Sequence, residues 1–92
     1  MPKHTIMAFQ LKPGHDDEAL IAELEHQFGW IRSDVRNVMM KAYREHYEDN
    51  DIIGSAKVEL EDCCADAKVK PKSVVITVCT QAPGMFTDDS NW

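Results

Sequence analysis

The chain has 92 residues, of which 43% are hydrophobic and 28% are charged, and its formal net charge is −6. This length and balance indicate one small globular domain and exclude a wholly disordered chain. No apolar run is long enough for a membrane span or a signal peptide, so we expect a cytoplasmic protein.

The chain contains three cysteines, Cys63, Cys64 and Cys79. An odd count, two adjacent members and the lack of an export signal indicate reduced thiols. Their spacing relative to the histidines matches no zinc motif, so we expect no metal and no cofactor. No glycine-rich phosphate loop and no nucleophile motif is present, so the sequence does not predict an enzyme.

Residues 3–13 predict a strand, because large apolar side chains alternate there with a mixed set. Pro13 and Gly14 end the strand, since proline cannot donate to a ladder and glycine tolerates a turn. The apolar set is Thr5, Met7, Phe9 and Leu11, and the interleaved set is His4, Ile6, Ala8, Gln10 and Lys12.

Two helices are predicted next. Residues 15–29 have an acidic first turn, an apolar stripe at four-residue spacing and a glycine at the end. The second helix is expected from Ser33, a good N-cap, to about residue 48, although the acids at residues 48–51 oppose the helix dipole at that end. Its apolar face is Val35, Val38, Met39, Ala42 and Tyr43.

The remaining chain is less regular. Residues 56–60 alternate like a short exposed strand, residues 61–72 indicate a loop or a weak helix, and residues 73–80 are rich in β-branched side chains and predict a strand. An acidic tail follows. The predicted fold class is therefore α+β, with residues 1–51 as one unit and residues 52–92 as a C-terminal extension.

The order of strand, Pro-Gly, acidic helix and Ser-capped helix resembles the ribbon-helix-helix superfamily typified by the Arc and MetJ repressors. The resemblance covers residues 3–48, and it is carried by Ala8-Phe9-Gln10-Leu11-Lys12-Pro13 and by Arg32-Ser33-Asp34-Val35-Arg36-Asn37-Val38-Met39-Met40-Lys41-Ala42-Tyr43. The first of these motifs is also similar to the opening of ParR-type plasmid partition proteins.

The resemblance implies a β-α-α unit that forms an intertwined homodimer, in which two N-terminal strands pair and enter the major groove of DNA. A repressor or a partition-type adaptor is the function it implies, with residues 52–92 contacting a protein partner or extending the dimer. Gln10 would pair with adenine, Lys12 with guanine or a phosphate, and the start of the second helix would hold a phosphate. The implied DNA-binding residues are Lys3, Ala8, Gln10, Lys12, Arg32 and Ser33.

Two alternatives remain open. The N-terminal strand could instead be an edge strand of a monomeric β-α-α-β-β domain, paired with residues 73–80. In function, the net charge of −6 favours an acidic protein-binding module, such as an antitoxin or a phage-encoded inhibitor that mimics DNA. Its partner-binding residues would be Asp16, Asp17 and Glu18, with Trp92 as a possible anchor.

Overall fold

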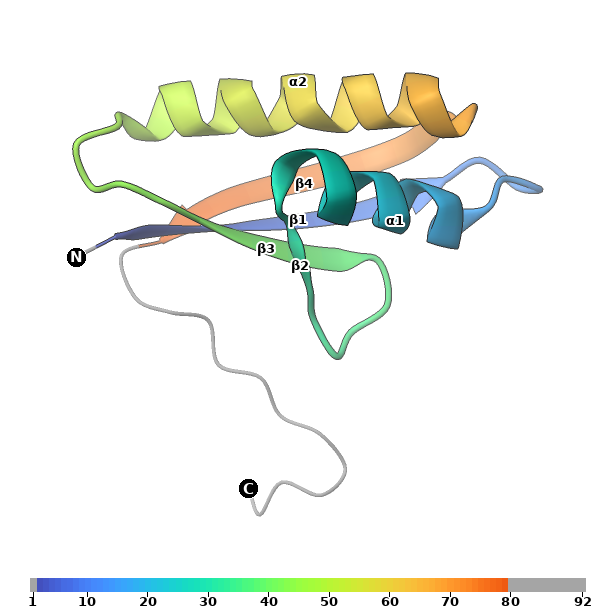
Figure 1. The fold of residues 1–92 in the computed structure, drawn as a ribbon, viewed down its shortest axis with the longest axis horizontal. Coiled ribbons are helices and arrows are strands. Elements are labelled where there is room, and N and C mark those ends of the chain that lie inside the picture. Colours follow the sequence, from blue (N-terminus) through green and yellow to red (C-terminus); the bar gives the residue numbers. More distant parts are fainter. Residues whose placement is uncertain (1, 80–92) are drawn as a thin grey trace, which may run out of the picture.

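Two helices cover one face of a four-stranded antiparallel sheet in the computed structural model, which describes residues 2–79 (Figure 1). The strand order is β2-β3-β1-β4. This architecture confirms the predicted α+β class, and its β-α-β-β-α-β order is the one called ferredoxin-like. The elements are β1 (Lys3–Leu11), α1 (Asp17–Phe28), β2 (Ile31–Arg32), β3 (Val38–Tyr43), α2 (Asp49–Ala67) and β4 (Pro71–Cys79).

The predicted N-terminal strand is β1, and it lies in the interior of the sheet. It pairs antiparallel with β3, where Met7 faces Met39, and with β4, where Met7 faces Ile76. The pairing with β4 inside one chain is the one that the monomeric alternative expected, but β1 is not an edge strand. Both of its edges are occupied, so a second copy of β1 could pair with it only after β3 or β4 had detached.

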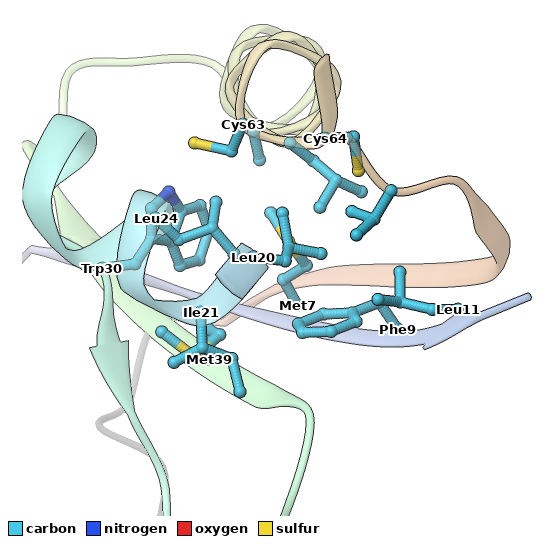
Figure 2. Close-up of a cluster of buried hydrophobic side chains, with 13 residues drawn as sticks. Met7, Phe9, Leu11, Leu20, Ile21, Leu24, Trp30, Met39, Cys63 and Cys64 are labelled. Carbon is cyan, nitrogen blue, oxygen red and sulfur yellow. The ribbon is translucent and has the colours of Figure 1, made fainter. Parts of the chain in front are cut away.

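Side-chain alternation along β1 gives the sheet two distinct faces. Met7, Phe9 and Leu11 are buried beneath the helices, as the sequence predicted, and they pack against Leu20 and Leu24 of α1. Figure 2 shows side chains from β1, α1 and α2 meeting in this core, with Cys63 and Cys64 contributed by α2. The helices therefore cover one face of the sheet, the inner face, and leave the opposite, outer face uncovered.

Helix α1 confirms the helix predicted at residues 15–29. It begins two residues after the predicted start and ends one residue before the predicted end. The Asp16 carboxylate caps it by accepting a hydrogen bond from the Glu18 amide at 3.0 Å. Gly29 ends it in the left-handed region at φ 72°, with its amide donating to the Leu24 carbonyl. The glycine at the end was predicted from the sequence, because its tolerance of a left-handed φ is a local property.

The predicted second helix over residues 33–48 is wrong, because this segment forms the β2–β3 hairpin loop and β3. Consequently the simple β-α-α order implied by the ribbon-helix-helix resemblance is not formed. The Ser33 hydroxyl closes a turn by accepting from the Val35 amide at 3.0 Å and donating to the Val35 carbonyl at 2.9 Å. Asn37 takes a left-handed φ of 62°, which asparagine tolerates better than most residues.

Local signals could not decide between helix and strand here. A serine side chain that bonds to the backbone caps helices and closes turns equally well. Six residues are also too few to separate a period of 3.6 from a period of two, and pairing with β1 favours the strand. On β3 the inward set is Met39, Lys41 and Tyr43, and the outward set is Val38, Met40 and Ala42.

Helix α2 replaces the strand predicted at residues 56–60, and it favours the weak helix over the loop for residues 61–67 of the predicted segment 61–72. The acids of residues 48–51, which opposed the dipole of the predicted helix, lie at the beginning of α2, where the dipole favours them. The buried positions recur at helical spacing, but they include an acid and two cysteines, so no apolar stripe was visible. They are Ile52, Ala56, Glu59, Leu60, Cys63 and Cys64.

Strand β4 confirms the strand predicted at residues 73–80 up to Cys79. Thr80 and the predicted acidic tail lie outside the described residues. The predicted boundary at residue 51 places β1 and β4 in different units, whereas the two strands pair along most of their length. Within residues 2–79, no helix is long and apolar enough to cross a membrane.

Two substitutions distinguish the observed hairpin from the helix that was expected at residues 33–48. Met39 is 1% exposed and Val35 is 61% exposed, although both belonged to the apolar face of the predicted helix. Met39→Ala is therefore expected to lower the free energy of unfolding by about 2–5 kcal/mol, and Val35→Ala by about 0.5 kcal/mol or less. Urea denaturation followed by circular dichroism measures both, and equal losses would favour the helix.

Candidate functional site

Within residues 2–79, the strand registers place no Asp, Glu, Lys or Arg on the outer face of the sheet, the face turned away from both helices. The strand registers place every second residue of each strand on it. From β1 and β3 these residues are His4, Ile6, Ala8, Gln10, Val38, Met40 and Ala42. From β2 and β4 they are Ile31, Ser73, Val75, Thr77 and Cys79.

Apolar side chains on this outer face are open to solvent. Ile31 is 62% exposed and Val75 is 64% exposed. Ile6 faces Met40 across β1 and β3, and Ala8 faces Val75 across β1 and β4, so apolar groups run across the three long strands. No element formed by residues 2–79 covers them (Figure 1). Ile6, Ala8 and Met40, which lie between these two exposed residues, are half-buried. An apolar sheet face that no helix covers is typical of an interaction site, since the solvated face of an antiparallel sheet is usually polar.

Two of the cations predicted to contact DNA are engaged with carboxylates. Lys3 donates to Asp49 at 2.7 Å. The Arg32 guanidinium contacts Glu25 at 2.8 Å and Glu18 at 3.3 Å, both on α1. The Arg32–Glu25 hydrogen bond lowers the pKa of the Glu25 carboxyl and raises the pKa of Arg32. Contact with a phosphate would require these cations to leave their present partners.

The other predicted DNA-binding residues are separated from these cations. Ala8 is half-buried and Gln10 is exposed, and both lie on the outer face. Lys12 is exposed just past the end of β1, where its amide donates to the Lys70 carbonyl at 3.0 Å. Ser33 lies in the hairpin turn and not at a helix start. The structure therefore places Ala8 and Gln10 on one face of β1, with Lys12 just beyond the end of that strand, and Arg32 is held elsewhere by acids of α1.

The acidic residues predicted to bind a partner gather at the start of α1, where each has a role within the fold. Asp16 caps the helix, Asp17 contacts Arg36 at 2.9 Å, and Glu18 contacts Arg32 at 3.3 Å. Trp92, the possible anchor, lies outside the described residues. These ion pairs are exposed, so each contributes little to stability, but they reduce the negative charge offered to a partner.

A buried polar cluster, which the sequence did not predict, joins β3 to α2. The Lys41 ammonium donates to Glu59 at 2.5 Å, and the Tyr43 hydroxyl donates to the same carboxylate at 2.6 Å. Lys41 also lies 5.8 Å from the ring centres of Phe28 and Trp30. Burial and the neighbouring carboxylate raise the pKa of Tyr43. Each charge in the cluster has a partner, as burial requires.

An open groove of about 850 Å³ lies beside this cluster, between the first turns of α2 and the end of β3. Tyr43, Tyr47, Ile52, Val58 and Glu59 contribute to its lining. The carboxylate of Glu59 already accepts hydrogen bonds from Lys41 and Tyr43, so its charge is satisfied inside the protein. The cluster and groove are explained by the attachment of α2 to the sheet.

The thiols of α2 are shielded. Cys63 and Cys64 are buried and free, and burial raises the pKa of both, that of Cys63 to about 12. A raised pKa disfavours the thiolate, which is the form that attacks electrophiles and binds metals. Among residues 2–79 no group of three or more His, Cys, Asp or Glu side chains could hold a metal ion.

No protein-family model matches this chain, and no curated protein sequence matches it. The outer face, defined by strand registers, is thus the candidate site that the fold itself offers. The sequence alone does not predict the outer face, because the residues of this face come from four strands whose order is set by tertiary pairing.

Proposed function

We propose that this chain is a protein-binding module whose docking surface is the outer face of its sheet. The observation that carries the proposal is that this face is free of formal charge in a chain with 28% charged residues. The centre of a protein–protein interface is depleted of charged residues, because each buried charge without a partner costs several kcal/mol, on the order of 3–5. Binding without catalysis is the activity that such a face supports.

A protein partner suits the outer face better than a nucleic acid does. Sheets that bind single-stranded nucleic acid present aromatic side chains on which bases stack, and they surround them with cations. Among residues 2–79, the strand registers place no Phe, Tyr or Trp on the outer face, and its central side chains are Ile6, Ala8, Met40, Val75 and Thr77. Methionine also adapts to irregular partner surfaces, because its side chain is unbranched and polarizable.

A protein-binding module was also the alternative function considered from the sequence, but its binding surface was expected at the acids that begin α1. The acids at the start of α1 were expected to meet a basic partner, and arginines of the same chain now contact two of them. The partner proposed here is recognised by apolar area instead of carboxylates.

Position-specific photo-crosslinking tests this function. A benzophenone side chain introduced in place of Val75, 64% exposed on β4, is expected to give a cross-linked adduct in the cell that makes the protein. The same group in place of Val58, 55% exposed on α2, is expected to give none. These two valines form a matched pair on opposite sides of the molecule. Equal adducts at both positions, or none at Val75, would contradict the proposal.

DNA binding is a second candidate, favoured by one group of side chains. Lys12, Lys70 and Lys72 are exposed near the end of β1 and the start of β4, and none of them forms an ion pair within residues 2–79. Exposed Gln10 lies on the adjacent strand end. Free lysines supply the phosphate contacts from which duplex affinity arises, although the charge of −6 opposes them.

A gel shift at low salt tests the second candidate. Lys12→Ala with Lys70→Ala is expected to weaken binding to duplex DNA by at least about tenfold. Lys57→Ala with Lys68→Ala serves as a control that removes the same charge from α2 and its end. If the wild-type chain binds no duplex, or both double variants bind equally well, DNA binding through this strand end is wrong.

A further inference from the structure

We propose that the occupant of the outer face is a second copy of this chain, and that two sheets pack face to face in a symmetric homodimer. This inference rests on the proposed function, because it names the partner of the same docking surface. It requires neither a free edge of β1 nor the exchange of a strand between copies.

The distribution of charge is compatible with a second copy as the occupant. Each chain carries −6, and the exposed acids of α2 lie on the helix side, so most other surfaces of a second copy would bring carboxylates toward apolar side chains. The outer face is the surface that brings none. Packing it against itself keeps the acids of both chains on the two far sides of the dimer, where water screens their repulsion. A self-complementary patch of this kind gives a two-fold interface.

The arrangement of polar and apolar groups on the outer face matches the anatomy of an interface. Ile6 and Ala8 lie on the middle one of the three longer strands, with Met40 and Val75 beside them. Thr77, which faces Ile6 on β4, is the polar member of this central group. Polar side chains lie toward the two ends, where His4 faces Cys79 and Gln10 faces Ser73. An apolar centre with a polar rim is the usual pattern of a protein–protein contact. The small Ala8 side chain permits a facing sheet to approach closely.

The size of the face sets the expected affinity. Strands β1 and β4 have nine residues each, which corresponds to a length of about 30 Å at about 3.3 Å per residue. Three long strands about 4.8 Å apart give a flat area of roughly 400 Å². This is about half of the roughly 800 Å² per partner in a standard stable interface, before side-chain relief is counted. The dimer is therefore expected to dissociate in the micromolar range.

Light scattering on the full chain, from about 1 to 200 μM, tests the inference. The mass is expected to rise with concentration from 10.5 kDa toward twice that value. Val75→Lys places a charge in the interface of each copy and is expected to weaken dimerisation by at least about tenfold. Val58→Lys adds the same charge on α2 and is expected to leave the dissociation constant within about twofold. Circular dichroism of both variants confirms that they are folded.

Two outcomes would overturn the inference: a monomer at every concentration, or a dimer that Val75→Lys and Val58→Lys affect equally. The photo-crosslinks distinguish this failure from failure of the proposed function. A monomer that cross-links at position 75 to another protein keeps the docking surface and rejects the second copy. A monomer with no adduct at position 75 rejects both. An adduct of two chains at position 75, together with a concentration-dependent dimer, supports both.

Discussion

The interior position of β1 is the constraint on which the rest of the structure depends. Hydrogen bonding to β3 on one edge and to β4 on the other fixes which side chains of three strands share a face. Because strand side chains alternate, Met7 and Phe9 lie on the face covered by the helices, whereas Ile6 and Ala8 lie on the opposite face. Two helices of this length cover one face only, so the outer face exists as soon as β1 has two neighbours (Figure 1).

The two sides of the molecule differ in charge, and this difference indicates which side binds a partner. Arginine–carboxylate pairs and the acids of α1 and α2 occupy the helix side, and the partly buried ion pair between Lys41 and Glu59 attaches α2 to β3. On a solvated sheet, charged and polar side chains normally occupy the outward positions. The strand registers place polar side chains but no Asp, Glu, Lys or Arg on the outer face. Apolar area among them is left exposed to water, and burial of that area against a protein is the simplest use for it.

What the sequence could predict was decided by the range of each signal. The sequence predicts β1, α1 and β4 because alternation, an acidic first turn, an apolar stripe, a terminal glycine and a β-branched run are local signals. β3 is not predicted because Ser33 suits a turn as well as a helix cap. The full length of α2 is not predicted because Glu59 interrupts its apolar stripe, and the burial of Glu59 depends on its ion pair with Lys41 of β3. The exposure of Gln10 and Lys12 was expected correctly, but the outer face depends on a strand order that no local pattern contains.

Nuclear Overhauser contacts in a mixture of isotope-labelled and unlabelled chains test the central claim most directly, since Cα atoms of facing antiparallel residues lie about 4.5–5.5 Å apart. The account predicts that contacts of β1 with β3 and β4, such as Met7 with Met39 and with Ile76, arise within one chain. Contacts between copies are expected only among side chains of the outer face. Backbone contacts between the β1 strands of two different chains would contradict the account and restore the paired ribbon.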